Sequence, residues 1–512
     1  MYISRQELNS IVVTAEQMAN IEGKIFEAGM PVAALMEKAA LMMSQRIQQL
    51  YPLHTVSKIG VLVGPGHNGG DALVIARELH LQGYDVCVYC PFTKLKELTQ
   101  KHANYAHSLG IPYHKDLQSL NHCQLIIDGL FGFGLKRSLS GNLAIDIDRL
   151  NEWSIPVVSV DIPSGLHTDT GEVLGTAVKA THSLCLGLWK PVYFQDQALV
   201  YTGIAEKIDF GIPLKDVFSI IAQQIPLQLL NKTLALGFLP LPRPQLTHKY
   251  QQGHLLLIAG SHRYAGASIL SSNGAKASGV GMLSVAVPES LKSLLISHIP
   301  DGLVIDCPVS EKGVIASLPP LATDFASYDI IACGPGLTRD ATEVVTRVLN
   351  AKCPLVLDAD ALNILAQLGT LNRLSKRKNA TVLTPHLGEF KRLFPDIHNP
   401  EKDRITAAKE AASQSGAIIL LKGARTIIAN PQGKIWIIPE STPALARGGS
   451  GDVLTGLIGG LLAQNKTTKH PLEAMVATAA WWHAQAAILA AKERSELGVD
   501  AGTLAQYLHL IF

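Results

Sequence analysis

Two glycine-rich turns lie far apart in the chain, and each has the composition of an anion-binding turn. The first runs from Gly64 to Asp71 (GPGHNGGD) and follows the apolar run Ile59 to Val63. The second runs from Arg447 to Asp452 (RGGSGD) and precedes a helical apolar run. Small residues at a helix start leave backbone N–H groups unpaired and expose the positive end of the helix dipole, which suits phosphate. The two turns therefore predict two chemical sites in one polypeptide.

Polar residues in the first half follow short apolar runs that are typical of buried strands. Asp128 follows one such run, and Asp161 follows another, with Ser164 three residues further on. Ligands bind at the carboxyl ends of strands in open parallel sheets, so these groups are expected to meet. Asn68, Asp128 and Ser164 are hard oxygen donors, as an alkali or alkaline-earth cation prefers. Two cations, Lys136 and Arg137, are suited to phosphate.

The first turn also satisfies the GxGxxG pattern through Gly64, Gly66 and Gly69. An ordinary dinucleotide-binding dehydrogenase needs, in addition, an acid at the end of its second strand. Here that strand ends Tyr89-Cys90-Pro91-Phe92, without one. The pattern therefore argues against that class, and we expect Asp71 to cap the helix that follows the turn.

In the second half, the chemistry centres on Asp452. Unpaired amides at this helix start can stabilise developing phosphoryl charge, and Asp452 can take a proton from a hydroxyl nucleophile. There is no GxxxxGK[ST], so the turn is not a Walker site. Lys422 and Arg425 follow a buried strand and carry charge for phosphate, and His386 follows another strand.

The elements that must position these residues alternate between short apolar runs and helices. Continuous apolar strands are buried on both faces, which indicates mostly parallel sheets and an α/β fold in both halves. A hairpin is expected over Thr426–Ala429 and Lys434–Ile438, and Thr14 with Gln17 forms a predicted capping box. The chain divides near residue 220, with a linker over 215–225.

Composition narrows the class of protein. Lys and Arg exceed Asp and Glu by 44 − 42 = 2, so no nucleic-acid or membrane-surface partner is indicated. The start of the chain has no apolar signal segment, and no apolar stretch is long enough to span a bilayer. Seven cysteines are expected to be reduced thiols in the cytoplasm. Cys87 and Cys90 form a CxxC within a strand, which does not indicate zinc.

The first half resembles the NAD(P)H-hydrate epimerase domain over residues 12–214. The motifs that carry this are GPGHNGGD, DGLFGFG, VDIPSGLHTDTGEVLG and Lys190-Pro191. The resemblance implies a Rossmann-like three-layer αβα domain, with Asp161 as the acid/base. It implies K⁺ bound by Asn68, Asp128 and Ser164. It also implies these substrate contacts: His67, Asn68, Gly69, Gly70, Asp71, Gly132, Phe133, Gly134, Leu135, Lys136, Arg137, Ser138 and Asp161.

The second half, residues 226–512, resembles the ribokinase-like superfamily and, within it, the NAD(P)H-hydrate dehydratases. The resemblance implies Asp452 as the catalytic base and Mg²⁺ with ADP as co-substrate. It implies hydrate binding by Ala265, Gly336, His386 and Asp452. It implies nucleotide binding by Lys422, Gly423, Ala424, Arg425, Thr426 and Gly451.

Together these resemblances predict a fused enzyme that acts on NADHX and NADPHX, the hydrates of NADH and NADPH. The first domain would interconvert their R and S forms, and the second would dehydrate the S form with ADP, giving AMP and phosphate. A homo-oligomer is expected. An alternative stays open: a kinase for a vitamin-precursor alcohol, fused to a binding module without catalysis. Nothing in the residues excludes ATP as the phosphoryl donor.

Overall fold

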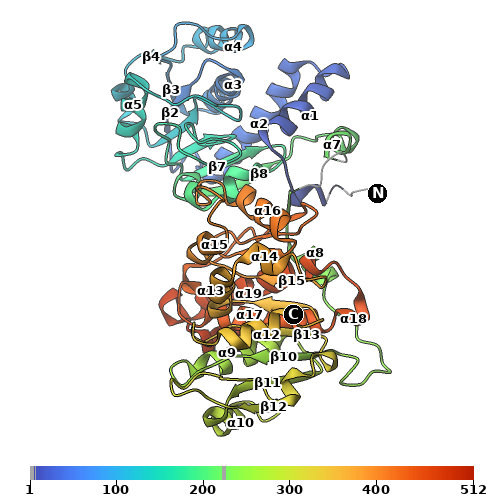
Figure 1. The fold of residues 1–512 in the computed structure, drawn as a ribbon. Coiled ribbons are helices and arrows are strands. Elements are labelled where there is room, and N and C mark those ends of the chain that lie inside the picture. Colours follow the sequence, from blue (N-terminus) through green and yellow to red (C-terminus); the bar gives the residue numbers. More distant parts are fainter. Residues whose placement is uncertain (1–4, 6, 222–226) are drawn as a thin grey trace. The chain divides into compact units, whose positions relative to one another are not determined.

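The computed structural model describes residue 5, residues 7–221 and residues 227–512 (Figure 1). The chain divides into two compact units, Met1–Pro226 and Leu227–Phe512. Each unit is built around its own sheet, and the α/β architecture expected for both is confirmed.

The sheet of the first unit is wholly parallel, in the order β4-β3-β2-β5-β6-β7-β8. The sequence gives no clear signal for β4 and β8, which lie at its edges. Its strands are β2 (Lys58–Val63), β3 (Asp85–Tyr89), β4 (Tyr113–His114), β5 (Leu125–Gly129), β6 (Val157–Val160), β7 (His182–Leu186) and β8 (Ile204–Ile208). A further short strand, β1, spans Ile11–Val12.

Helices cover both faces of this sheet, because successive strand residues point in opposite directions. Val61 and Val63 are buried with α2 and α3, whereas Leu62 is buried with α5 on the other face. The unit therefore has three layers. Its helices are α1 (Ala15–Glu27), α2 (Val32–Leu50), α3 (His67–Leu81), α4 (Glu97–Ser108), α5 (Asn142–Leu150), α6 (Leu199–Thr202) and α7 (Leu214–Ile221).

Two predictions concern the ends of this unit: the capping box at Thr14 and the linker over 215–225. The capping box at Thr14 is confirmed: Gln17 N–H donates to the Thr14 hydroxyl, and the Thr14 N–H donates to the Gln17 side chain. The predicted linker, in contrast, begins with helix α7. Val217 and Ile221 of that helix are buried in a core shared with α1, so this segment folds as part of the first unit. Residues 222–225 of the predicted linker lie outside the described residues.

The second unit contains a larger mixed sheet, in the order β9-β18-β17-β16-β15-β14-β13-β10-β11-β12. The expected hairpin is confirmed: β17 is antiparallel to both β16 and β18, whereas β18 is parallel to β9. From β16 to β12 the strands are parallel. The strands are β9 (Leu227–Leu229), β10 (His254–Ile258), β11 (Met282–Pro288), β12 (Leu303–Cys307), β13 (Ile330–Cys333), β14 (Leu355–Leu357), β15 (Thr381–Leu383), β16 (Ile418–Leu421), β17 (Ile427–Ala429) and β18 (Ile435–Ile437).

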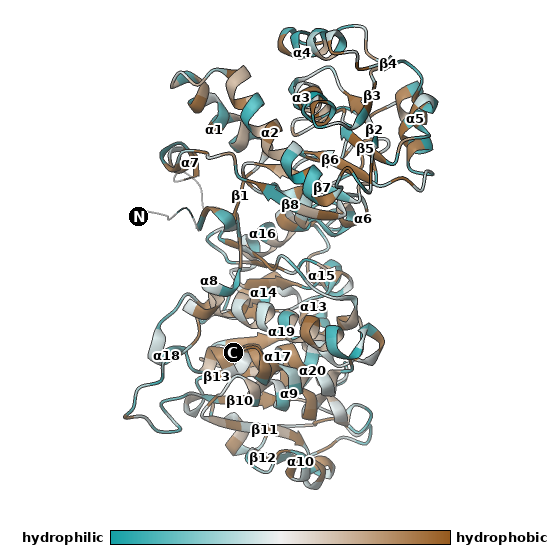
Figure 2. Ribbon diagram, turned by 180° about the vertical axis from the view of Figure 1, so that it is seen from behind, coloured by the Kyte–Doolittle hydropathy of each residue, from teal (hydrophilic) through white to brown (hydrophobic). Residues whose placement is uncertain are grey.

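The helices of the second unit lie around this sheet, and apolar residues line the strands and α17 (Figure 2). They are α8 (Lys232–Gly237), α9 (Ala265–Ala277), α10 (Lys292–His298), α11 (Pro320–Thr323), α12 (Thr342–Leu349), α13 (Ala359–Leu368), α14 (Thr370–Leu374), α15 (Leu387–Leu393), α16 (Arg404–Ser415), α17 (Ser450–Ala463), α18 (Asn465–Thr468), α19 (Leu472–Arg494) and α20 (Ala501–Tyr507).

Helices α9 and α17 pack with their backbones in close contact. A Cβ atom on Gly456 of α17 would lie 1.7 Å from the carbonyl oxygen of Ser271 on α9. Only glycine fits at that crossing, which accounts for the small-residue composition of α17.

All seven cysteines are buried free thiols. In the part of the chain that the structure describes, no helix is both long enough and apolar enough to cross a membrane.

Candidate active sites

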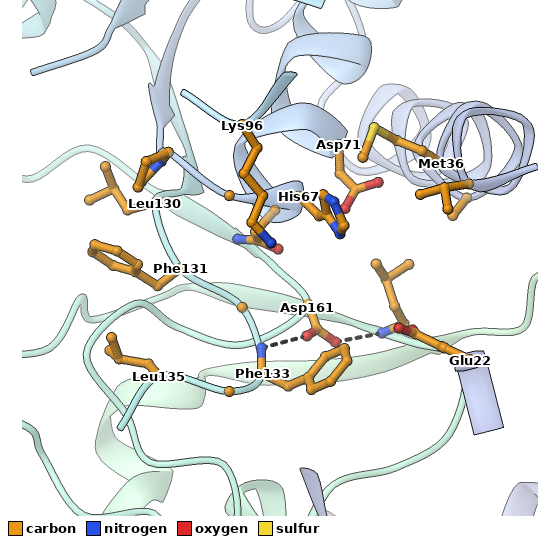
Figure 3. Close-up of a pocket in the computed structure, with 18 of the residues that line it drawn as sticks. Glu22, Met36, His67, Asp71, Lys96, Leu130, Phe131, Phe133, Leu135 and Asp161 are labelled. Carbon is orange, nitrogen blue, oxygen red and sulfur yellow. Dashed lines mark hydrogen bonds between the residues drawn. The ribbon is translucent and has the colours of Figure 1, made fainter. Parts of the chain in front are cut away.

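A cavity of about 640 Å³ lies in the first unit, at the carboxyl ends of its strands (Figure 3). The glycine-rich turn, the segment after β5 and Asp161 after β6 all reach it, as parallel strands require. Most of the predicted epimerase residues lie on its wall: His67, Asn68, Asp71, Gly132, Phe133, Gly134, Leu135, Lys136, Arg137 and Asp161.

Three predicted contact residues are not on that wall. Ser138 lies beyond it along the same segment, and Gly69 and Gly70 are buried in the first turn of α3. A Cβ on Gly69 would lie 2.0 Å from the Gly64 carbonyl oxygen, so this glycine permits a tight turn.

The expectation that Asp71 caps the helix is wrong. Helix α3 begins at His67 and its N-cap is Gly66, so Asp71 is one turn inside the helix. That position directs its carboxyl toward the cavity instead of toward the helix start (Figure 3).

Asp161 is the most constrained residue of this site. It is 2% exposed and has a φ of 66°, in the left-handed region that non-glycine residues rarely adopt. The Phe133 N–H donates to its Oδ2 over 3.0 Å, and Lys190 Nζ lies 2.6 Å from its Oδ1. The Tyr193 hydroxyl donates to its backbone carbonyl. These contacts hold a carboxylate at the cavity wall in a single orientation.

Two residues of this site escaped sequence reasoning as functional groups, Glu22 and Lys190. Lys190 is fully buried. Burial disfavours its charged form, but the attraction of Asp161 outweighs this and leaves its pKa above the ordinary value. The Lys190-Pro191 motif could have indicated it. Glu22 lines the cavity from α1, outside the sheet, and no motif marks it.

Three carboxyl groups, those of Glu22, Asp71 and Asp161, lie on the cavity wall. Burial raises the pKa of Glu22 to about 7, with Lys190 opposing and Asp161 adding to the rise. Burial, together with the charges of Asp161 and Glu22, also raises the pKa of Asp71 well above its ordinary value. Near neutral pH the site therefore combines an ion-paired carboxylate with carboxyl groups that can hold a proton.

Asp128, predicted as a cation ligand, is completely buried behind the cavity. It accepts hydrogen bonds from the hydroxyl and N–H of Ser164, at 2.6 and 2.9 Å, and from the Ser159 hydroxyl at 2.9 Å. Leu130 N–H supplies a fourth bond at 3.3 Å. All four donors are neutral, and burial raises the Asp128 pKa despite them. A buried carboxylate bonded in this way lacks a counter-charge.

The Asn68 side chain contacts Val160 and Gly132. With the amide turned over, its nitrogen donates to the Val160 carbonyl over 3.3 Å and its oxygen accepts the Gly132 N–H over 3.3 Å. Two of the predicted cation ligands, Asp128 and Ser164, are thus in direct contact. The Ser164 hydroxyl also accepts the Phe131 N–H of the segment after β5, the segment that the Asn68 side chain reaches at Gly132.

The second site lies at the carboxyl ends of neighbouring parallel strands in the second unit. Ala265 begins α9 after β10, Gly336 follows β13, His386 follows β15 and Lys422 follows β16. The loops touch: a Cβ on Gly336, where φ is 65°, would lie 2.8 Å from the Ala267 Cβ. The predicted hydrate-binding residues are therefore arranged along one edge of the sheet.

Helix α17 brings Asp452 to this edge. Its N-cap, Gly449, has a φ of 92°, which glycine adopts without strain. Burial raises the pKa of Asp452 to about 7, the nearby Asp358 adds to the rise, and Lys422 opposes it. A carboxyl group with a pKa near 7 is suited to act as a general base at neutral pH.

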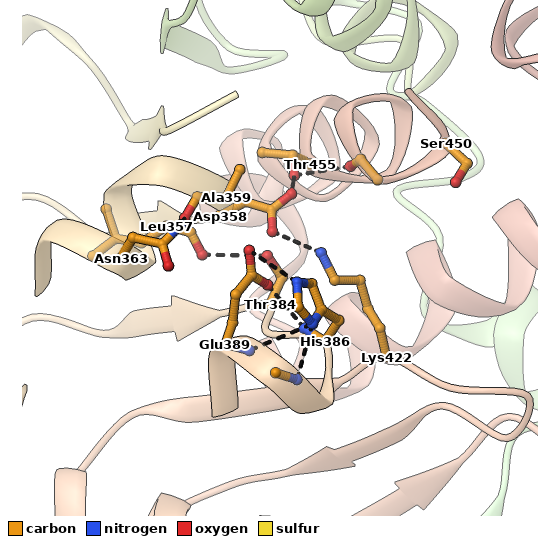
Figure 4. A network of polar contacts seen from close by, with 12 residues as sticks. Leu357, Asp358, Ala359, Asn363, Thr384, His386, Glu389, Lys422, Ser450 and Thr455 are labelled. Atoms are coloured by element: carbon orange, nitrogen blue, oxygen red, sulfur yellow. Dashed lines mark hydrogen bonds and ion pairs between the residues drawn. The ribbon is translucent and has the colours of Figure 1, made fainter. Parts of the chain in front are cut away.

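Lys422 forms part of a polar network in which Asp358 joins it to Thr455 (Figure 4). Its Nζ is 2.8 Å from Asp358 Oδ1, and the Thr455 hydroxyl donates to Asp358 Oδ2 over 2.6 Å. A Cβ on Gly451 would be 3.5 Å from Lys422 Nζ, so the ammonium lies against the start of α17. The positive charge of Lys422 therefore lies close enough to the start of α17 to contact a phosphate group bound there. Sequence reasoning did not assign roles to Asp358 or Thr455.

The remaining predicted nucleotide contacts, Gly423, Ala424, Arg425 and Thr426, form the turn between β16 and β17, directly after Lys422. His386 is the N-cap of α15, where its Nδ1 accepts the Gly388 N–H at 3.0 Å. His483, on α19, was missed. Its Nε2–H donates to the Ser450 carbonyl over 2.9 Å, and burial lowers its pKa to about 4, so it holds the α17 start as a neutral ring.

Comparison with known proteins supports both halves. Residues 255–510 match the family model described as NAD(P)H-hydrate dehydratase, and residues 32–192 match that of the YjeF-related protein N-terminus. The bifunctional NAD(P)H-hydrate repair enzyme Nnr of Synechocystis sp. is 56% identical over 97% of this chain and 94% of its own length. That of Thermosynechococcus vestitus is 50% identical over 98% and 96%.

Among solved structures, the chain is similar to the ADP/ATP-dependent NAD(P)H-hydrate dehydratase from Bacillus subtilis, co-crystallized with ATP/Mg²⁺. The identity is 33%, the TM-score is 0.44, and the match covers 52% of this chain and 91% of that one.

The fold and its two sites thus define a fused enzyme in which each of two α/β units carries its own acid at the carboxyl ends of parallel strands. Within that class, the chain belongs to the family of bifunctional NAD(P)H-hydrate repair enzymes.

Proposed function

We propose that the chain repairs hydrated NADH and NADPH in two steps. The first domain, residues 12–214, interconverts the R and S hydrates, and the second, residues 226–512, dehydrates the S form with ADP. The observation that carries this proposal is the presence of both acids, Asp161 and Asp452, at the carboxyl edges of separate sheets within a chain that matches the family over nearly its whole length.

For epimerisation, the hydroxyl at C6 of the hydrate must leave with a proton, and water must then add to the opposite face of the resulting iminium. Two groups serve this best, one to give a proton and one to accept it. Asp161, held as a carboxylate by Lys190, accepts the proton of the incoming water. Glu22, on the cavity wall, donates a proton to the departing hydroxyl. Exchange with solvent returns both groups to their starting states.

This assignment predicts a pH dependence. An acid whose pKa is raised to about 7 is protonated below that value, so the epimerisation rate should fall as pH rises above about 7. Glu22→Gln should lower the rate roughly 10²–10⁴-fold and remove that limb of the profile. The matched control is Glu27→Gln, which changes an exposed carboxyl on the same helix. An unchanged profile in the Glu22→Gln enzyme would exclude Glu22 as the acid.

We propose K⁺ as the cofactor of the first site, bound by Asn68, Asp128 and Ser164. The support is the buried Asp128 carboxylate, whose hydrogen bonds all come from neutral donors. When bound, the ion supplies positive charge beside the segment after β5. The residues themselves then hold that segment in place through the Phe131 N–H, which donates to the Ser164 hydroxyl.

Epimerisation should accordingly be faster in potassium chloride than in choline chloride of equal ionic strength. Asp128→Asn should lose this activation, because it removes the buried negative charge. Ser159→Ala removes one hydrogen bond to Asp128 but no proposed ligand, and should keep the activation. Equal rates of the wild-type enzyme in the two salts would contradict the potassium site.

For dehydration, Asp452 removes the proton of the C6 hydroxyl, which attacks the terminal phosphoryl group of ADP. AMP leaves, phosphate then leaves from C6 to give an iminium, and loss of a proton from C5 to solvent restores the dihydropyridine. Lys422 and the N–H groups at the start of α17 stabilise the charge that develops on the phosphoryl oxygens. A poor leaving group, hydroxide, thereby becomes a good one.

We propose that Mg²⁺ accompanies the nucleotide in this site, where it neutralises phosphate charge. Glu389 offers a suitable hard oxygen ligand, since burial raises the pKa of this carboxyl and a cation would relieve that cost. The Glu389 carboxyl also accepts the His386 N–H over 2.9 Å, and Asp358 is bound to Lys422 and Thr455. Comparing rates with ADP and with ATP identifies the donor.

The deciding experiment incubates purified enzyme with an R/S mixture of NADH hydrate, ADP and Mg²⁺, and follows the absorbance of regenerated NADH. Complete conversion with release of AMP and phosphate supports the repair activity. The alternative, a vitamin-precursor kinase with a non-catalytic first domain, is not favoured by the family matches; it would instead give a stable phosphorylated alcohol. We further propose a cytoplasmic homo-oligomer, which light scattering and cell fractionation test.

A further inference from the structure

Two thiols and an imidazole meet in the first unit, apart from the carboxyl groups of the cavity. Cys87 Sγ and Cys123 Sγ lie 3.6 Å apart, and with a ring nitrogen of His122 all three potential ligand atoms lie within 4.8 Å of one another. We propose that these residues form a Zn²⁺ site, with two thiolates and one imidazole as protein ligands and water in the fourth position.

The distances match tetrahedral zinc. With Zn–S bonds of about 2.3 Å, two sulfur ligands of one tetrahedral ion lie roughly 3.8 Å apart. The observed 3.6 Å separation is close to that value. It is much longer than a disulfide bond of about 2.05 Å. Together with an imidazole nitrogen, the two thiolates form a ligand set that suits zinc. Calcium and magnesium prefer oxygen ligands instead.

The sheet creates the space for this cluster. Cys87 lies in the middle of β3, and its partner on β2 is Gly60. Gly60 has no side chain to fill the face above it, so Leu120 of the short helix Leu117–Leu120 occupies that place. A Cβ on Gly60 would lie 2.7 Å from Leu120 Cδ2. The close approach of this helix brings the next residues, including Cys123, down to the Cys87 thiol.

The surroundings suit a bound soft cation. Cys87 and Cys123 are 7% and 5% exposed and belong to an apolar core with Leu62 and Ile126. His122 is exposed, which gives an ion a route from solvent and leaves room for a water ligand. Among the residues that the structure describes, none forms a hydrogen bond with the His122 ring, so the ring is available to turn toward the thiols.

The CxxC pattern pointed to a different pair. Cys90 is buried with the core on the opposite face of the sheet from Cys87, and its thiol donates to the Phe92 carbonyl. The partner of Cys87 is instead Cys123, which a local motif cannot reveal.

The test uses the full-length protein, reduced and freed of metal, then incubated with Zn²⁺ and desalted. We expect stoichiometric retained zinc by elemental analysis. Loading with Co²⁺ should give the ultraviolet thiolate-to-cobalt charge-transfer bands and intense visible bands of a tetrahedral site. Cys123→Ser should lose the charge-transfer intensity and the retained zinc, while Cys90→Ser, a buried thiol of the same strand region, should keep both. Circular dichroism and thermal unfolding verify that each variant is folded.

Three results would overturn the proposal. The reduced wild-type protein could fail to retain zinc. Folded Cys123→Ser could retain as much zinc as the wild-type chain. Mass spectrometry could find the pair joined as a disulfide, two hydrogens lighter, in protein purified without oxidant. None of these outcomes depends on the epimerase or dehydratase activity, so they are separate from failure of the proposed function.

Discussion

Asp452→Asn is expected to abolish dehydration while leaving nucleotide binding nearly unchanged. The amide keeps the size of the side chain at the start of α17 but cannot accept the proton of the C6 hydroxyl. Loss of a general base commonly lowers a rate by about 10²–10⁴-fold. The measurement is the initial rate of NADH formation from pure S hydrate with ADP. A calorimetric titration with ADP measures nucleotide binding, and exposed Asp340→Asn is the matched control.

The pH profile gives this prediction a second readout. Burial raises the pKa of Asp452 to about 7, and a general base works in its ionised form. The dehydration rate should therefore rise with pH up to about 7 and then level off. This is the reverse of the epimerisation profile, in which the protonated form of Glu22 is the active one. A wild-type rate or an unaltered profile in the Asp452→Asn enzyme would remove Asp452 from its role.

Asp161→Asn is expected to make dehydration of an R/S mixture biphasic. The S fraction should react at the wild-type rate, because Asp452 lies in a separate unit. The R fraction should then react only as fast as it epimerises without catalysis. Absorbance of regenerated NADH, with ADP in excess, records both phases.

Mixing the two variants provides the control. The Asp452→Asn chain retains an intact first domain, and the Asp161→Asn chain retains an intact second domain, so together they should restore a single fast phase. The Asp161→Asn protein alone must be assayed where spontaneous epimerisation is slow. A monophasic curve under those conditions would show that Asp161 is not the epimerase acid/base.

The parts of the fold that could be predicted are those that depend on local patterns. Continuous apolar runs predicted parallel strands, because such strands are buried on both faces. Polar residues after those runs, such as Asp161 and His386, were expected at one edge of each sheet, because the carboxyl ends of parallel strands lie on the same side. The hairpin after β16 followed from its turn residues.

Residues that reach a site through tertiary packing could not be predicted. Glu22 lies on a helix outside the sheet, and its position in the cavity depends on how α1 packs. Asp71 is of a residue type that often caps helices, yet helix α3 begins four residues earlier, at His67. Asp71 therefore lies inside the helix and lines the cavity instead of capping the helix. The segment that forms helix α7 was expected to be linker because no local pattern marked it as part of a domain. Its burial comes from contacts with α1, which the local sequence does not reveal.

The contact between α9 and α17 has a mechanical consequence for the second site. Gly456 and Ser271 bring the two backbones together without intervening side chains, so the helices form one stiff body. One helix begins at Ala265, in the loop proposed to bind the hydrate, and the other begins two residues before Asp452. This close packing limits the movement of the Ala265 loop relative to Asp452. The contact between α9 and α17 therefore sets the position of the proposed hydrate-binding loop relative to Asp452, the proposed base. Proton transfer from the hydrate depends on that relative position.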